Sequence, residues 1–210
     1  MIMYKKAIRG VSPAGEHGFA LVSSLMFLVV LTIFVISSMG TNALEEKMLG
    51  FSRDRQVALQ AADAALRDAE RYMLLGSLPG ATGFSAGCST GTGLYQIQTS
   101  GAPIWIALES DVSCKDDAWI GKASAINAAN GKSFKYGTLT SAPEFKLDNS
   151  RPVASQPRFI IEVITIASTG SGSRKIGFGA TSTKYVYRVS AVGFGQRLST
   201  RVLLQAVYRM

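Results

Sequence analysis

Two hydrophobic patterns follow one another in the first 75 residues. Between Phe19 and Leu44 the sequence has no charged residue, and the stretch from Phe19 to Met39 is almost wholly apolar. An α-helix needs about 20 apolar residues to cross the ~30 Å hydrocarbon layer of a membrane. Because the 210 residues contain one such stretch, the pattern predicts a single transmembrane helix.

The segment from Thr41 to Leu75 predicts a continuation of the same helix. It is rich in Ala, Leu, Glu, Gln, Met and Arg, which favour helices, and Gly76 and Pro79 end it. Asp63 and Arg67 are spaced for an ion pair on its outer surface. Apolar residues at three-and-four spacing form one stripe, made of Leu59, Ala62, Leu66, Ala69 and Met73. Both halves together predict a helix about 85 Å long.

Three strands are predicted in the last third of the chain. Phe159–Ala167 is an apolar run interrupted only by Glu162, as expected of a central strand, whereas Lys184–Gly193 and Arg201–Tyr208 alternate. The glycine-containing link between the last two favours a hairpin. We therefore predict an α+β fold, with an antiparallel β-sheet packed on the amphipathic half of the long helix.

The middle of the chain gives weaker signals. Residues 76–101 are rich in Gly, Ser and Thr and are predicted to form a loop, while 102–108 and 119–127 are too short to assign. This region holds both cysteines, Cys88 and Cys114. In an exported protein two cysteines most simply form one disulfide; a functional thiol is the alternative, although neither lies in a Cys-x-x-Cys pair.

Charge is distributed unevenly along the chain. Residues 1–120 carry nine Lys/Arg against eleven Asp/Glu, a net charge of −2, and residues 121–210 carry thirteen against three, a net charge of +10. A basic face on the C-terminal strands would suit an acidic partner protein, a membrane surface or DNA; a merely solvated set of cations is the alternative. Its candidate members are Arg174, Lys175, Lys184, Arg188, Arg197, Arg201 and Arg209.

The sequence points away from an enzyme and from bound cofactors. Its one histidine, His17, precedes the apolar stretch, and no glycine-rich loop carries the lysine of a phosphate-binding motif. One group of carboxylates could hold Ca²⁺ through oxygen ligands but does not match an EF-hand loop, so a solvated turn is the better interpretation. That group is Glu109, Asp111, Asp116 and Asp117.

The residues before the apolar stretch predict its orientation and processing. Lys5, Lys6 and Arg9 precede it, which predicts a cytoplasmic N-terminus and an exported C-terminus. A secretory signal ends in small residues after its apolar core, but here Gly18 stands before that core. This layout resembles that of a type IV prepilin, in which cleavage leaves the helix on the mature protein. An uncleaved signal anchor is the alternative.

Longer segments carry a resemblance to one family. Four segments carry the first part of this resemblance: the apolar run that ends in Ser37-Ser38-Met39, then Leu44-Glu45-Glu46-Lys47-Met48, then Ala58-Leu59-Gln60-Ala61-Ala62 and Ala64-Ala65-Leu66-Arg67. Together they resemble the N-terminal signature of PilX-type minor pilins of type IV pili. The end, YRVSAVGFGQ…STRVLLQAVYRM, resembles that family's closing hairpin. The resemblance covers roughly the first 70 and the last 25 residues.

The resemblance implies a processed, membrane-inserted subunit. Prepilin peptidase would cleave after Gly18 and leave Phe19 as an N-methylated first residue. Ser23 would then stand where major pilins carry a glutamate that pairs with a neighbouring subunit, which favours a position at or near the pilus tip over an internal one. The implied organisation is a leader (1–18), a transmembrane and filament-core helix (19–43), its amphipathic half (44–75) and a soluble head (76–210).

The resemblance also implies a function and partners. The chain is expected to act as a minor pilin that takes part in initiating type IV pilus assembly, through helix packing and head–head contacts. Its expected partners are other minor pilins, the major pilin, a tip adhesin and, before assembly, the inner membrane. Adhesion and twitching motility would depend on the pilus. Two alternatives are a pseudopilin of type II secretion and a membrane-anchored basic module that binds DNA or a surface ligand.

Overall fold

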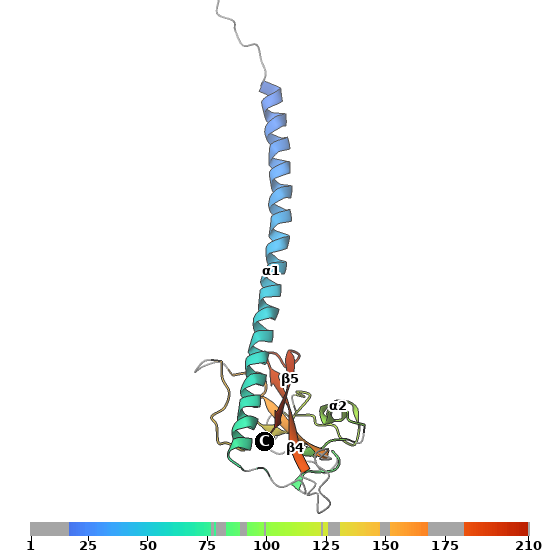
Figure 1. Ribbon diagram of the computed structural model, residues 1–210. Coiled ribbons are helices and arrows are strands. Elements are labelled where there is room, and N and C mark those ends of the chain that lie inside the picture. The colour runs from blue at the N-terminus through green and yellow to red at the C-terminus, as the bar shows by residue number, and fades with distance from the viewer. Residues whose placement is uncertain are drawn as a thin grey trace, which may run out of the picture. The chain divides into compact units, whose positions relative to one another are not determined.

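The computed structural model describes residues 17–76, 78, 83–88, 92–98, 100–122, 124–125, 131–147, 152–167 and 183–209, apart from the side chains at 17, 39–43, 167 and 183. The chain divides into two compact units, residues 1–50 and 51–210. Helix α1, His17–Leu74, contributes residues to both (Figure 1). The long helix predicted from Phe19 is therefore present. Its end agrees with the predicted one within a residue.

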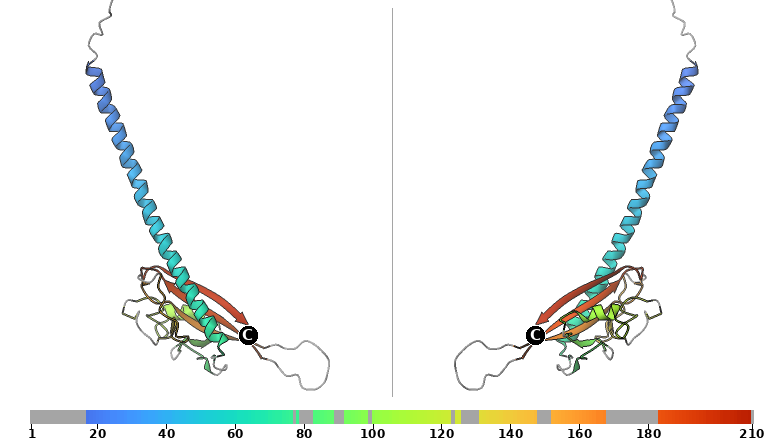
Figure 2. Two further views of the ribbon diagram at one scale, coloured as in Figure 1. Left: turned by 90° about the vertical axis from the view of Figure 1, so that its left-hand side faces the viewer. Right: turned by 90° about the vertical axis from the view of Figure 1, so that its right-hand side faces the viewer.

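In residues 51–210 the sheet is built around β3, Arg158–Ala167. β3 pairs antiparallel with β4, Thr183–Phe194, which pairs antiparallel with β5, Arg201–Arg209. On its other edge β3 pairs in parallel with β1, Leu94–Gln96, and antiparallel with the two-residue β2, Phe134–Lys135. The three predicted strands are confirmed as β3, β4 and β5, with β3 central, and Figure 2 shows the long strands from two sides.

Two features of the middle region differ from the prediction. The segment predicted to be a loop contains β1, which makes the sheet mixed instead of purely antiparallel. Residues 102–108, which could not be assigned, overlap a short helix, α2, Ile104–Ser110. Both elements depend on long-range packing: Leu94 pairs with Ile161, and Leu108 is fully buried in a cluster that includes sheet residues. The fold class, α+β, is confirmed.

The first core cluster lies between α1 and one face of the sheet. Ala65, Ala69 and Met73 of α1 meet buried residues of β3 and β4 such as Ile161 and Val189. The predicted apolar stripe is correct for Ala62, Ala69 and Met73 but wrong for Leu59, which is 48% exposed. The buried positions of α1 begin instead with Val57, Ala58, Ala61 and Ala62. Small residues face the sheet there because β4 comes close to the helix backbone.

That close approach occurs at Gly193 of β4. A Cβ atom placed on Gly193 would lie less than 3.0 Å from backbone atoms of Ala58, Ala61 and Ala62. Real Cβ contacts are not this short, so only glycine fits. Two buried aspartates of α1 bind loops to the helix: Asp54 lies one turn before this contact, and Asp68 lies further along the helix. The Asp54 carboxylate accepts a hydrogen bond from the Gln196 N–H, and Asp68 accepts one from the Gly137 N–H at 2.8 Å.

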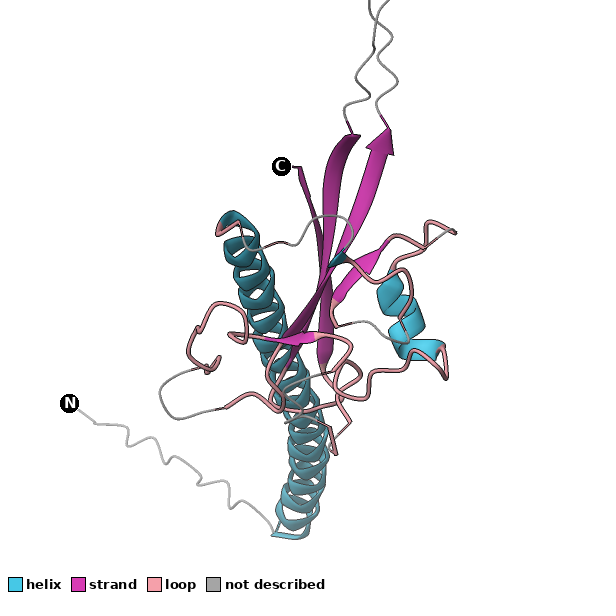
Figure 3. Ribbon diagram, turned by 90° about the horizontal axis from the view of Figure 1, so that it is seen from below, coloured by secondary structure: helices cyan, strands magenta, loops and turns pink. Residues whose placement is uncertain are grey.

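The second core cluster lies on the opposite face of the sheet. It combines Ile160, Val192 and Phe194 of the strands with residues around α2, including the fully buried Trp119. Figure 3 shows the strands between α1 and α2. Each face of the sheet therefore carries a packed layer of its own.

Candidate functional site

The junction predicted for leader cleavage lies at the start of α1. Gly18 and Phe19 are in its first turn, and the Phe19 side chain is 76% exposed. The basic leader residues Lys5, Lys6 and Arg9 lie outside the described residues. Cleavage after Gly18 and methylation of Phe19 remain predictions.

The N-terminal part of α1 is suited to an apolar environment. Gly18–Ser38 is long and apolar enough to cross a membrane, with a mean hydropathy of 2.8. Two of its hydroxyl groups donate hydrogen bonds within the helix: Ser23 Oγ donates to the Ala20 carbonyl at 3.1 Å, and Thr32 Oγ1 donates to the Val29 carbonyl at 2.8 Å. A hydroxyl without a partner would be costly in hydrocarbon. The Ser23 hydroxyl already has a hydrogen-bond acceptor within its own helix.

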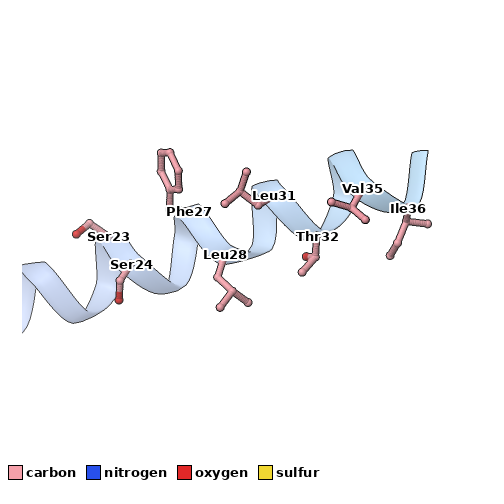
Figure 4. Close-up of a pocket in the computed structure, with 8 residues that line it drawn as sticks. All are labelled: Ser23, Ser24, Phe27, Leu28, Leu31, Thr32, Val35 and Ile36. Atoms are coloured by element: carbon pink, nitrogen blue, oxygen red, sulfur yellow. The ribbon is translucent and has the colours of Figure 1, made fainter. Parts of the chain in front are cut away.

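One face of this segment forms two parallel rows of side chains (Figure 4). Ser23, Phe27, Leu31 and Val35 make one row, and Ser24, Leu28, Thr32 and Ile36 make the other. Residues four apart form the ridges that pack into grooves of a neighbouring helix. Because all eight side chains come from one helix, they form an open surface for helix packing and not an enclosed binding site.

A disulfide joins Cys88 to Cys114 with a Cα–Cα distance of 5.1 Å, as predicted. Both cysteines are buried, in the cluster that holds α2 and Trp119. The bridge therefore links the segment before β1 to the turn after α2. The disulfide therefore lies within the second core cluster and has a structural role.

Glu162 connects α2 to the centre of the sheet. Its buried carboxylate accepts two hydrogen bonds from Arg188, at 2.9 and 2.8 Å, and a third from the Ile104 N–H at 3.0 Å. A charge without a partner would be expensive at this position, and the two-pronged guanidinium contact offsets that cost. Arg188, predicted as a member of a basic face, is therefore engaged within the fold, with a side chain only 14% exposed.

A second buried polar network joins the start of β3 to the residue before β2 and to the segment after α2. Arg158 donates to the hydroxyl and the carbonyl of Ser133 at 2.8 and 2.9 Å, and the Ser133 hydroxyl donates to Asp116 at 2.6 Å. Burial lowers the pKa of Arg158 from its usual value, and the Asp116 carboxylate opposes this shift. Burial also raises the pKa of Tyr95, whose hydroxyl donates to the Lys132 carbonyl. The polar groups of Arg158, Ser133, Asp116 and Tyr95 are therefore engaged in hydrogen bonds within the fold.

The acidic residues considered for Ca²⁺ are engaged separately. Asp116 belongs to the buried network, Glu109 pairs with Arg201 at 2.8 Å, and Asp117 pairs with Lys122 at 2.8 Å. Asp111 accepts a hydrogen bond from the Ser113 N–H, and bonds from Ser113 lower the pKa of this carboxyl. Among the described residues no group of three or more His, Cys, Asp or Glu side chains is placed to hold a metal ion.

The structure describes five of the seven predicted basic residues. Arg188 and Arg201 pair with carboxylates, and Arg197 lies over the Phe51 ring, 5.5 Å from its centroid. Lys184 and Arg209 are exposed at adjoining ends of β4 and β5. Arg174 and Lys175 lie outside the described residues. The basic surface, as a binding site, remains a prediction.

The described residues include a helix that is long and apolar enough to cross a membrane, and residues 51–210 form an α+β unit with a disulfide. This combination is the one expected of the pilin class. Comparison with known families agrees with this class. Residues 86–210 match the type IV pilus assembly protein PilX C-terminal family, and residues 17–67 match the PilX N-terminal family.

The chain therefore belongs to the PilX family of type IV pilus minor pilins. No curated protein and no solved structure matches it. The PilX family is a structural component of the type IV pilus.

Proposed function

We propose that this chain is a minor pilin that helps to initiate type IV pilus assembly and occupies a position at or near the pilus tip. The proposal rests on Ser23, which stands at the place where major pilins carry a glutamate. The Ser23 hydroxyl donates a hydrogen bond within its own helix. A carboxylate in hydrocarbon requires a partner. A subunit with serine at this place does not need the N-terminal amine of a subunit beyond it.

The proposal includes a route into the filament. The chain enters the inner membrane through Gly18–Ser38, with its C-terminus in the periplasm, and prepilin peptidase cleaves after Gly18. The exposed apolar rows of α1 then pack among the helices of other minor pilins and the major pilin. Residues 51–210 remain available for contacts with other subunits or a tip adhesin.

Two measurements test this proposal in order. The first is the N-terminal mass of the chain from cells with and without active prepilin peptidase. A chain that starts at N-methylated Phe19 only when the peptidase is active is expected; a chain that keeps its leader in both strains would leave an anchored binding module. The second is immunogold labelling of sheared pili, where label at filament ends is expected and label along the shaft would refute the tip position.

A further inference from the structure

In the described part of the chain, the face of the sheet opposite α1 is buried at one end and exposed at the other. At the covered end Ile160, Val192 and Phe194 are buried under α2 and its neighbours. Strand register places four further aliphatic residues on this same face, beyond α2. We call Ile164, Ile166, Val186 and Val207 the aliphatic patch.

The patch is exposed although its residues are aliphatic. Val207 is 64% exposed and Ile166 is 47% exposed, and Ile164 and Val186 are partly exposed. Ile164 and Val186 are directly paired across β3 and β4, and Val207 of β5 lies diagonally from Val186. Cross-strand and diagonal neighbours are close enough to form one contiguous surface. Such surfaces mark interaction sites on soluble domains.

Positive charge borders the patch. Lys184 pairs across the strands with Ile166, and Arg209 pairs with Val186, so both exposed cations stand directly beside patch residues. The only carboxylate on these three strands, Glu162, already binds Arg188. From residue 163 to residue 210 the sequence has seven Lys/Arg and no Asp or Glu. A partner at this surface would therefore meet cations without competing carboxylates from these strands.

We propose that the aliphatic patch is a docking surface for the head of another pilin subunit, which presents an apolar centre bordered by Asp or Glu. This inference rests on the proposed function. An apolar centre with a charged rim is the usual anatomy of a protein interface, and complementary charges select and orient the partner. The cations Lys184 and Arg209 would set the register of the two heads.

The chemistry of the patch favours a protein partner over DNA or a lipid surface. DNA is bound mainly through its phosphates, to which an aliphatic centre offers nothing. Lipid surfaces are entered by aromatic and long apolar side chains that reach into the acyl region. The patch contains only short β-branched side chains fixed on a pleated sheet.

The test compares the full-length chain, purified in detergent, with two matched pairs of variants. Val207→Glu places a charge in the patch, whereas Val112→Glu places it at a residue 96% exposed outside these strands. Lys184→Glu combined with Arg209→Glu reverses the rim, and Lys115→Glu combined with Lys146→Glu is its exposed control with the same change in charge. The probes are each minor pilin produced with this chain, purified in detergent, and phosphatidylglycerol vesicles.

The expected result is that one minor pilin binds the wild-type chain and the two controls equally. Its Kd rises about tenfold or more with Val207→Glu and with the rim reversal, and rises with salt in the wild type. Unchanged urea midpoints of the variants would show that they fold. The inference is overturned if no minor pilin distinguishes Val207→Glu from Val112→Glu, or if the patch variants lose vesicle binding instead.

The two proposals fail in different ways. If the wild-type chain is cleaved after Gly18 and enters filaments but the patch variants bind every pilin as the controls do, only the docking surface is refuted. If the chain is never cleaved, the proposed function and the docking surface fall together.

Discussion

The contact between Gly193 and α1 yields the sharpest stability prediction, for the substitution Gly193→Ala. The added methyl group would lie less than 3.0 Å from the backbone of Ala58, Ala61 and Ala62. An ordinary contact is about 3.5 Å, so helix and strand must separate by a little more than about 1 Å to relieve the two shortest contacts, with the Ala58 carbonyl oxygen and the Ala62 nitrogen. The obstructing atoms belong to a helix backbone and cannot rotate away as a side chain would.

The expected loss follows from that rigidity. Overpacking a core costs about 1–3 kcal/mol, and the backbone contact places this substitution in the upper half of the range, at about 2–3 kcal/mol. Replacing glycine by alanine also lowers the conformational entropy of the unfolded chain, which stabilises the folded state by about 0.5 kcal/mol. The expected net loss already includes this gain. For a unit the size of residues 51–210, the loss corresponds to a decrease in Tm of about 4–12 °C.

The assay is thermal unfolding of the full-length chain in detergent, followed through tryptophan fluorescence, because Trp119 is fully buried. Gly87→Ala is the matched control, since a Cβ atom at Gly87 meets nothing within 4 Å. Its Tm should stay within about 2 °C of the wild-type value. If Gly193→Ala behaves like the control, the close approach of β4 to α1 is not a constraint on the fold.

Three further outcomes test other parts of the structure. Glu162→Gln should lower the free energy of unfolding by about 3–5 kcal/mol in urea titrations, because Arg188 then lacks its carboxylate. Adding a second substitution, Arg188→Met, should restore part of the lost free energy, and no recovery would contradict the ion-pair explanation. Replacing both Cys88 and Cys114 by serine should cost about 3.5 kcal/mol in the chain-entropy treatment of a 26-residue separation, and a reductant that leaves the wild-type urea midpoint unchanged would refute this. Burial raises the pKa of Tyr95, so the stability that the neutral Tyr95 side chain contributes is complete below about pH 10, where the unfolded tyrosine is also neutral, and is lost as pH rises toward the higher folded pKa. In Tyr95→Phe the urea midpoint should therefore fall less steeply with rising alkaline pH than in the wild type, and an equal slope would oppose this explanation.

Elements with a strong local pattern could be predicted from the sequence. The apolar run of α1, the breakers after Leu75 and the alternation along β4 and β5 each identify an element without knowledge of its neighbours. The ion pair between Asp63 and Arg67, at 2.9 Å, also depends only on helical spacing. Local periodicity was therefore sufficient for the helix and the three long strands.

Features that depend on distant contacts could not be predicted in this way. β1 is three residues long and forms because Leu94 and its neighbours pair with β3, more than 60 residues away. Leu59 fits an apolar stripe by spacing but is exposed, because the side of α1 that meets the sheet is set by where Gly193 approaches it.

The candidate site shows the same limit. Sequence position groups Arg188 with the other cations of the C-terminal strands, whereas its partner Glu162 is 26 residues distant. One signal was present in the sequence: Glu162 is the single charge in the apolar run of β3. A lone carboxylate in a central strand calls for a cation, and Arg188 became identifiable as that cation only once the register of β3 and β4 was known.

The alanine face of α1 also bears on how force passes through residues 51–210. Between β4 and the helix at Gly193 there are no long side chains whose rotamers could absorb a displacement. A pull on this part of α1 therefore reaches the sheet backbone almost directly, with little compliance. In a filament under tension, such a junction would transmit load with little relative movement of helix and sheet. Longer side chains at the same place would deform under the load and allow more movement.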